Sequence, residues 1–295
     1  MHKVLGDRKA ILLFIAPALI IFMTLLFVPI IWSSVYTFFE GSLIKGFDFA
    51  GLSNYFAIFN DSDFYNSLWI TIKFTLVVTT GQVFLGLMLS LLFVFYIKRA
   101  SFLIRTLVFF PVVLPTVAIA QLFSKLFEIA PNYGLINSLL AALDMEQFIA
   151  PWLGQTSTAF WILCIMEIWK AMGFYAVILY AGLMDVPEDV LEAAKIDGAK
   201  GWKLTQFIIL PLIKPILISS IIFSLSGTLK VFEQVVALTN GGPGKSTTTL
   251  SVYMYQQAFT SGNYGYGSTI ALVLLFLTLI ITLIVYRVSW KDATK

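Results

Sequence analysis

The 295-residue sequence is poor in the residues on which most catalytic and metal sites depend. Cys164 is the only cysteine, which excludes an intrachain disulfide and a thiolate-ligated metal site. His2 is the only histidine, which excludes a histidine-cluster metal site and a catalytic triad built on histidine. Charged residues are scarce as well, at 12% of the chain, where soluble domains have about 25%.

Hydrophobic residues are correspondingly abundant and make up 59% of the chain. This proportion leaves too little polar surface to cover a water-soluble fold, and it also excludes intrinsic disorder. The net charge of +3 comes from basic residues scattered between apolar stretches, which is not the clustered pattern of a nucleic-acid-binding protein. The composition therefore predicts a multi-pass protein of the cell membrane.

A helix needs about 20 apolar residues to cross the hydrocarbon layer of a bilayer. Stretches of this kind predict an all-α polytopic fold with six transmembrane helices, at about 10–38, 68–97, 104–127, 158–184, 208–230 and 264–287. The first stretch is too long for a cleaved signal peptide and lacks a small-residue cleavage pattern. The third and fifth contain prolines, which membrane helices tolerate where neighbouring groups satisfy the freed backbone.

The orientation follows from the excess of lysine and arginine in cytoplasmic loops. An even number of spans places both termini on one side, together with twelve basic residues: Lys3, Arg8, Lys9, Lys98, Arg99, Arg105, Lys195, Lys200, Lys203, Arg287, Lys291 and Lys295. The opposite side has five, Lys45, Lys73, Lys125, Lys230 and Lys245. We therefore expect both termini in the cytoplasm.

The loop after the fourth span has the features of a helix-turn-helix. Asp185 is a suitable N-cap, Pro187 is tolerated in a first helical turn, and acidic residues follow it. Gly198 permits a backbone reversal, and a second short helix is expected over 199–209. A slim apolar face, on which another protein can close tightly, is formed by Leu191, Ala193 and Ala194. An amphipathic loop resting on the membrane surface is the alternative that these features leave open.

The same loop resembles the signature of binding-protein-dependent ABC importer permeases. The signature is Glu192-Ala193-Ala194, three residues, Gly198, nine residues, and then Ile208-Ile209-Leu210-Pro211. Further stretches are similar to the carbohydrate (maltose-type) branch of this family: Ile168-Trp169-Lys170 through Ala181-Gly182-Leu183, Leu238 to Gly244 followed by Ser246-Thr247, and Tyr264-Gly265-Tyr266-Gly267. The resemblance covers about 66–288, without the long extra external domain and extra spans of the maltose permease's larger subunit.

The resemblance implies a type I ABC importer permease fold and a division of the chain into three parts. These are an N-terminal transmembrane helix with an external loop (1–65), a permease core with a cytoplasmic coupling loop at 185–211 (66–288), and a cytoplasmic tail (289–295). It further implies a heterodimer with a second homologous permease, two copies of a cytoplasmic ATPase, and an extracellular sugar-binding protein. The chain itself would be no enzyme and would hold no cofactor, since ATP and Mg²⁺ bind to the ATPase.

In such permeases the coupling loop fits a cleft on the ATPase, and its glutamate meets a basic residue there. The resemblance assigns that role to Glu192. It implies that Ala193 and Ala194 allow close approach and that Gly198 makes the turn. Asp197, Leu210 and Pro211 complete the predicted coupling loop.

Ionisable and polar residues inside the spans are the remaining hypotheses for function. Glu167 and Lys170 stand three residues apart on one face of the fourth span, where charges are costly and often functional. They either neutralise each other or a partner helix, or they line the path of a sugar together with Tyr175 and Gln82. The stretch Gly244-Lys245-Ser246 does not predict a phosphate-binding loop, because Thr239 stands where that motif needs glycine.

Other classes of transporter and enzyme remain as alternatives. One is a permease of the same superfamily for a solute that is not a sugar. A secondary transporter driven by an ion gradient would show repeat symmetry and an acidic site at mid-membrane, for which Glu167 is the one residue available. An intramembrane enzyme would need histidine pairs or converging carboxylates, which the sequence lacks.

Overall fold

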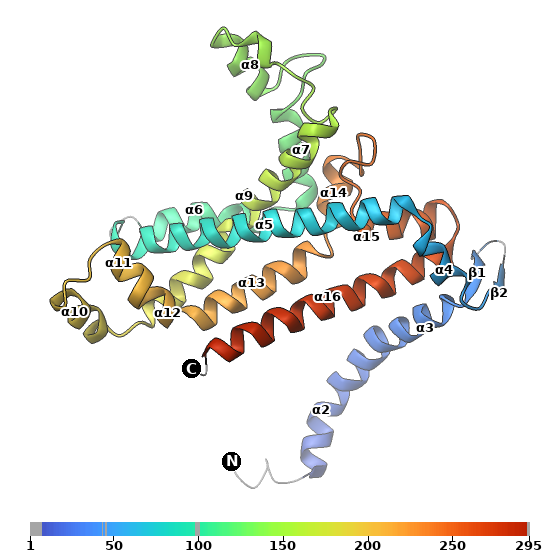
Figure 1. The fold of residues 1–295 in the computed structure, drawn as a ribbon, viewed down its shortest axis with the longest axis horizontal. Coiled ribbons are helices and arrows are strands. Elements are labelled where there is room, and N and C mark those ends of the chain that lie inside the picture. Colours follow the sequence, from blue (N-terminus) through green and yellow to red (C-terminus); the bar gives the residue numbers. More distant parts are fainter. Residues whose placement is uncertain (1–7, 43, 45, 98–100, 294–295) are drawn as a thin grey trace. The chain divides into compact units, whose positions relative to one another are not determined.

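The computed structural model of the protein describes residues 8–42, 44, 46–97 and 101–293. The chain forms two compact units, one of residues 1–62 with 253–273 and the other of 63–252 with 274–295. Helices make up most of the regular structure in the described part of the chain (Figure 1), as the sequence predicts.

The first unit begins with the N-terminal apolar stretch, which is helical over nearly its whole predicted length. It consists of α2 (Arg8–Phe22), a π-helical turn η1 (Met23–Phe27) and α3 (Val28–Tyr36). The π-helical turn ends two residues before Pro29, which lacks the N–H group that would continue regular α-helical pairing. No residue between 11 and 36 is buried, which suits a helix surrounded by lipid.

A small β-hairpin and a short helix follow in the stretch that the sequence analysis treats as an external loop. Strands β1 (Phe39–Ser42) and β2 (Gly46–Phe49) pair antiparallel, and α4 (Ser53–Phe59) comes next. The amide of Asn54 fixes the hairpin by donating to the carbonyl oxygens of Thr37 and Phe39, each at 2.9 Å.

The C-terminal part of the chain is formed by α15 (Leu250–Tyr255), the π-helical turn η4 (Gln256–Thr260) and α16 (Tyr264–Ala293).

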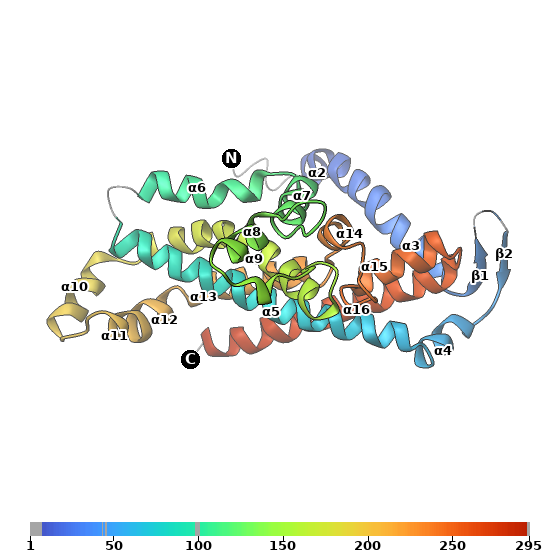
Figure 2. The ribbon, with the colours of Figure 1, turned by 90° about the horizontal axis from the view of Figure 1, so that it is seen from above.

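The second unit is built on two long helices, α5 (Ser62–Phe95) and α9 (Thr156–Met184). Helix α6 (Ser101–Val113) runs beside α9, as Figure 2 shows. A β-carbon at Gly173 of α9 would lie 2.1 Å from the carbonyl oxygen of Val108 in α6. The close crossing of these two helices therefore depends on glycine, as is common where helices pack in membranes.

Two of the predicted spans are bent pairs of helices. The third consists of α6 and α7 (Thr116–Leu126), which meet at 99°, and the fifth joins the segment Trp202–Leu212 to α13 (Lys214–Thr228) at 75°. Pro115 occupies the N-cap position of α7, and Pro215 lies in the first turn of α13. Both positions are ones where a proline can start a helix but cannot continue the preceding one.

With these pairs counted as spans, the described residues contain six, and without them four: Ile11–Tyr36, Ser62–Phe95, Thr156–Met184 and Tyr264–Val288. The predicted polytopic helical class is thus confirmed. Placement of both termini in the cytoplasm, and the division at residues 65 and 288, stay predictions.

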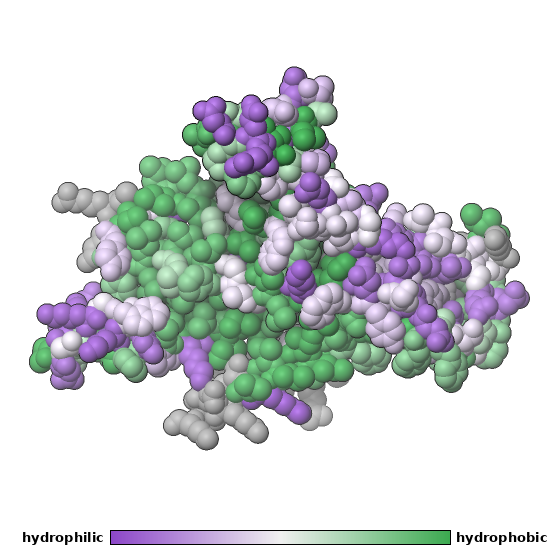
Figure 3. All heavy atoms as spheres, turned by 45° about the horizontal axis from the view of Figure 1, so that its top comes forward, coloured by the Kyte–Doolittle hydropathy of each residue, from purple (hydrophilic) through white to green (hydrophobic). Residues whose placement is uncertain are grey.

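The remaining elements of the second unit are short. They are α8 (Leu135–Ala142), the 3₁₀ turn η2 (Glu146–Phe148), α10 (Glu188–Ile196), α11 (Trp202–Leu204), the π-helical turn η3 (Thr205–Ile209), α12 (Leu210–Leu212) and α14 (Glu233–Leu238). In Figure 1, α10 and α11 lie beyond the C-terminal end of α5. In Figure 3, hydrophilic side chains gather at this same end of the unit, beside the hydrophobic surface of the helices.

Candidate functional site

The helical loop at one end of the second unit has the predicted helix-turn-helix form, with a different start. Asp185 ends α9 and is not the N-cap of the next helix; Pro187 takes that position with an extended backbone. Helix α10 then begins at Glu188, with two acidic residues in its first turn and Lys195 in its last. These charges complement the helix dipole at both ends.

Gly198 makes the turn that the sequence predicts. Its φ is +85°, and a β-carbon there would meet no atom within 4 Å, so the backbone angle rather than space requires glycine. The turn is closed by a bond of 2.8 Å from the N–H of Ala199 to the carbonyl oxygen of Ala194. A second glycine with positive φ, Gly201 at +54°, lets the next helix start only at Trp202 instead of at residue 199.

One face of α10 packs against the protein itself. Ala194 is buried in a hydrophobic cluster that includes Leu204 and Ile209 of the loop and Leu179 and Leu183 of α9. Leu191 is packed against the same cluster. The expected apolar face of Leu191, Ala193 and Ala194 is therefore divided, because Ala194 supports the loop from within and cannot meet a partner.

The opposite face of α10 is open to solvent. Glu192 and Ala193 are exposed there, and so is Asp197 at the C-terminal end of the helix. Ile196 is the residue that the sequence analysis missed, and its side chain is 86% exposed. Its position two residues before the turning glycine, one helical turn after Glu192, is the signal that places it on this face. This face of α10 thus presents an apolar side chain and a carboxylate to solvent.

Leu210 and Pro211 lie where the loop returns to the fifth span. Leu210 packs against the cluster around Ile209 and Ile213, whereas Pro211 is exposed in the first turn of α12. These two residues connect the loop to α13, whose first residue is Lys214.

A buried polar cluster joins α5 to α9 and α13 among the spans. Ser224 of α13 donates to Oε1 of Gln82 at 2.8 Å and to Oγ1 of Thr79 at 3.1 Å, and Thr79 is also bonded to Thr228. Gln82 in turn donates to the backbone carbonyl oxygen of Glu167 in α9. Serine and threonine at 224 and 228 are one helical turn apart, a spacing that marks a polar stripe on an otherwise apolar helix.

Glu167 and Lys170 each bond to a neighbouring helix, and no hydrogen bond or ion pair joins their side chains. Lys170 donates to Oγ1 of Thr116 in α7 at 2.8 Å, and Oε1 of Glu167 accepts a longer bond, 3.4 Å, from Gln234 in α14. The other carboxylate oxygen, Oε2 of Glu167, is buried and has no hydrogen-bond partner among the described residues. The hydroxyl of Thr75 is likewise buried without a hydrogen-bond partner among the described residues.

Tyr175 belongs to the packed core. It is 6% exposed and part of the hydrophobic cluster that holds Ala194 and Leu179. A β-carbon at Gly86 of α5 would lie 2.8 Å from the β-carbon of Tyr175, so the two helices meet closely at this point. Of the four residues predicted for the sugar path, Gln82 and Glu167 are joined by a hydrogen bond. Tyr175 interacts with Ser224 of the polar cluster, whereas Lys170 is bonded to Thr116.

The Asn-Gly-Gly-Pro stretch folds into a loop held by its own hydrogen bonds. Thr248 and Thr247 donate to the carbonyl oxygens of Gly241 and Gly242 at 2.9 and 2.8 Å. Lys245, the lysine of the apparent phosphate-loop motif, forms an ion pair of 2.6 Å with Asp63. The loop follows helix α14 rather than a strand, so it lacks the structural context of a phosphate-binding loop.

Membrane-spanning helices, a buried polar cluster between them and a helical loop with an open, partly apolar face define a membrane transport subunit. The chain belongs to the family of binding-protein-dependent transport system inner membrane components, whose model matches residues 82–289. It is therefore the multi-pass membrane component of an ABC transporter.

Curated relatives align with the chain over almost its whole length. The sulfoquinovosyl glycerol transport system permease protein SmoG of Agrobacterium fabrum is 34% identical, over 96% of this chain and 91% of that protein. The trehalose/maltose transport system permease protein MalF of Thermococcus litoralis is 32% identical, over 96% and 94%.

Solved structures show the same fold. A chain of a bacterial ABC transporter involved in the import of the acidic polysaccharide alginate superposes with a TM-score of 0.82 at 22% identity. The match covers 98% of this chain and 99% of that one. The predicted type I importer permease fold is thereby confirmed.

Proposed function

We propose that the chain is one of two permease subunits of an ATP-driven importer for a sugar or oligosaccharide. Its relatives carry the names of permeases for sulfoquinovosyl glycerol and for trehalose and maltose, and they match over 96% of the chain. In this proposal an extracellular binding protein delivers the sugar, and a second homologous permease forms the other half of the pore.

The observation that carries the proposal is the open face of α10. Glu192, Ala193 and Ile196 present a carboxylate, a small side chain and an exposed apolar side chain on one short helix. The opposite face of the helix is fixed to α9 through Ala194. A partner that binds the open face would therefore move α9 with the loop, because the buried cluster packs the two elements against each other.

In this proposal the partner is a cytoplasmic ATPase, which is present in two copies and binds ATP and Mg²⁺. Closure of the two ATPases on ATP would displace the loops and turn the spans from an inward-open to an outward-open state. The permease itself performs no chemistry in this scheme.

The path of the sugar is assigned to the polar cluster around Gln82 and Glu167, with Lys170 at its edge and Tyr175 as packed support. A buried polar atom without a partner costs about 1–3 kcal/mol. Oε2 of Glu167 and the hydroxyl of Thr75 are two such atoms. Sugar hydroxyls are donors and acceptors and would satisfy both while the solute passes.

The test is a charge reversal on the open face, Glu192→Lys, with Glu146→Lys as the matched control. Glu146 is equally exposed but lies in η2, on the predicted external side. We expect Glu192→Lys to lower ATP-driven sugar uptake at least tenfold and to abolish co-purification of the ATPase, because a basic site on the partner would repel the new charge.

Glu146→Lys should retain both properties, and both variants should insert in the membrane. Ile196→Ser should weaken co-purification in the same direction as Glu192→Lys. Normal uptake together with a normally stimulated ATPase in both loop variants would show that α10 is not the coupling element.

A further inference from the structure

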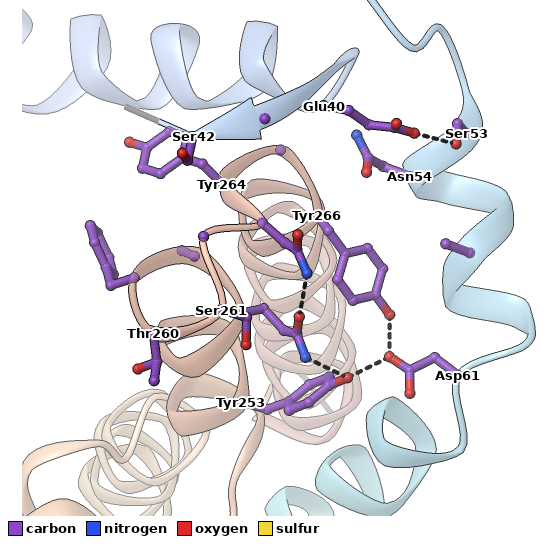
Figure 4. Close-up of a pocket in the computed structure, with 18 of the residues that line it drawn as sticks. Glu40, Ser42, Ser53, Asn54, Asp61, Tyr253, Thr260, Ser261, Tyr264 and Tyr266 are labelled. Atoms are coloured by element: carbon purple, nitrogen blue, oxygen red, sulfur yellow. Dashed lines mark hydrogen bonds between the residues drawn. The ribbon is translucent and has the colours of Figure 1, made fainter. Parts of the chain in front are cut away.

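The first unit contains a cavity of about 870 Å³, and none of its lining residues belongs to the coupling loop or the polar cluster. Its walls come from the β-hairpin, α4 and Asp61 on one side and from residues 253–266 on the other (Figure 4). On the predicted topology these segments face the outside of the cell. A volume of this size is in the range of cavities that hold small-molecule ligands.

Glycines allow the two walls to approach each other. A β-carbon at Gly265 would lie 1.8 Å from the carbonyl oxygen of Phe39 in β1, so no other residue fits between the hairpin and the start of α16. A β-carbon at Gly267 would lie 2.6 Å from that of Ala258. The alternation of Tyr264-Gly265-Tyr266-Gly267 thus gives close backbone packing and leaves two tyrosines at the cavity.

The polar side chains of the cavity are held in one connected network. Tyr253 and Tyr266 both donate to Oδ2 of Asp61, at 2.6 and 2.5 Å. Gln257 donates to the hydroxyl of Tyr253 at 3.1 Å, and Asn263 donates to Oε1 of Gln257 at 3.3 Å. Figure 4 shows this chain of dashed bonds along the wall, with the groups aligned in advance of any ligand.

The cavity combines two further properties. Its described lining includes the carboxylates of Glu40 and Asp61 and no lysine or arginine, so its charge is negative. Aromatic side chains form the apolar part, where the ring of Tyr264 lies 6.0 Å from that of Phe259. Carboxylates, amides and hydroxyls beside aromatic rings suit a ligand with many hydroxyl groups and apolar C–H faces.

We propose that this cavity is a binding site for a neutral oligosaccharide on the permease itself, separate from the transport path. The proposal rests on the proposed function, because it takes the imported solute to be a sugar. Hydroxyl groups of the sugar would donate to Glu40 and Asp61 and accept from Gln257 and Asn263. The negative charge disfavours sugars that carry a carboxylate, such as uronic acids, because like charges repel in a partly enclosed site.

The experiment uses the complete transporter in lipid nanodiscs without its binding protein. Saturation-transfer-difference NMR would measure binding of three neutral trisaccharides, maltotriose, raffinose and xylotriose, and of trimannuronate, an acidic one. We expect transfer to at least one neutral sugar and none to trimannuronate. Tyr266→Phe and Gln257→Ala should each weaken that binding at least fivefold, since each removes one polar group of the network and leaves the backbone packing intact.

Asp48→Asn is the matched control, because Asp48 is exposed on β2 and does not line the cavity. It should bind the neutral sugar as the unaltered protein does. Absence of transfer to all neutral sugars, equal transfer to trimannuronate, or unchanged binding in both cavity variants would overturn the proposal.

ATP-driven uptake, measured with the same variants in sealed proteoliposomes supplied with the binding protein, separates this proposal from the proposed function. Uptake of a neutral sugar without binding in the cavity would refute the cavity site alone. Absence of uptake for every sugar, with a solute of another class transported instead, would refute the proposed function.

Discussion

At the scale of single residues, glycines in this chain serve two different physical purposes. Gly198 is needed for its backbone angle, since its φ is +85° and the space around it is open. Gly265 is needed for space, since a β-carbon there would overlap the backbone of β1. The first kind of glycine can be recognised in the sequence at a turn between two helices, whereas the second depends on a segment distant in the chain.

The prediction at this scale concerns substitution of Gly198. Gly198→Ala forces an L-residue into a left-handed angle at a cost of about 1–2 kcal/mol, and the β-branched Gly198→Val costs more. We expect Gly198→Val to misalign α11 with α10 and to lower uptake at least tenfold, with Gly198→Ala intermediate. Uptake and the amount of membrane-inserted protein are the measurements.

Gly46 is the matched control for this prediction. Its φ is +87°, and a β-carbon there would also meet nothing within 4 Å, but it lies in the β-hairpin. Gly46→Val should therefore strain the chain equally without uncoupling transport from ATP hydrolysis. Equal loss of coupling in both variants would contradict a specific role for the turn at Gly198.

At the scale of secondary-structure elements, prolines and buried hydrogen bonds decide how the spans are arranged. Pro115 and Pro215 start new helices, so two apolar stretches become bent pairs at 99° and 75°. Thr116, directly after the first bend, is placed to accept a hydrogen bond from Lys170 of α9. The charges of α9 thus find partners on neighbouring helices instead of on their own.

The prediction at this scale is a pair of double-mutant cycles. Because Lys170 is bonded to Thr116, the double variant Lys170→Met/Thr116→Val should be destabilised by less than the sum of the two single variants. The midpoint of thermal unfolding in detergent is the measurement. A second cycle of Glu167→Gln with Lys170→Met should show the smaller coupling, because no hydrogen bond joins these two side chains.

A larger coupling energy in the second cycle than in the first would contradict this expectation. It would show that Glu167 and Lys170 stabilise each other, as their spacing suggests. Glu167→Gln alone keeps the shape of the side chain and removes its charge. In our proposal it lowers uptake while leaving the amount of folded protein unchanged.

At the scale of the whole molecule, the distribution of charge sets the orientation in the membrane. Basic residues are concentrated near the termini and in alternate loops, among them the loop that contains α10. The coupling role and the external cavity both depend on this orientation, since α10 must be inside and the β-hairpin outside. Orientation is therefore the property of the whole chain on which both proposals rest.

The corresponding prediction is topological. A reporter fused after Lys295 should be active only in the cytoplasm, and one inserted near Asp144 only outside. Cysteine labelling with a membrane-impermeant reagent would check both positions in a Cys164→Ala background. Labelling of position 295 from outside intact cells would contradict the orientation and, with it, the placement of the coupling loop.

The sequence by itself determined the properties that depend on local or summed chemistry. Hydropathy alone specified a polytopic helical membrane protein, because crossing a bilayer requires long apolar helices. The turn at Gly198 could also be predicted, because a helix that must reverse needs a residue tolerant of positive φ. The loop signature around Glu192 was sufficient to indicate the family.

Tertiary structure decided everything that depends on which side chains meet. The short helix α10 has apolar residues on two faces, and only its packing on α9 shows that Ala194 is internal and Ile196 open. Spacing suggests that Glu167 pairs with Lys170, yet the bend at Pro115 offers Lys170 a nearer partner. Asp61 and Tyr253 are 192 residues apart in sequence, and no local pattern reveals their bond or the cavity beside it. Contacts between distant segments arise from packing, which neither hydropathy nor backbone preference encodes.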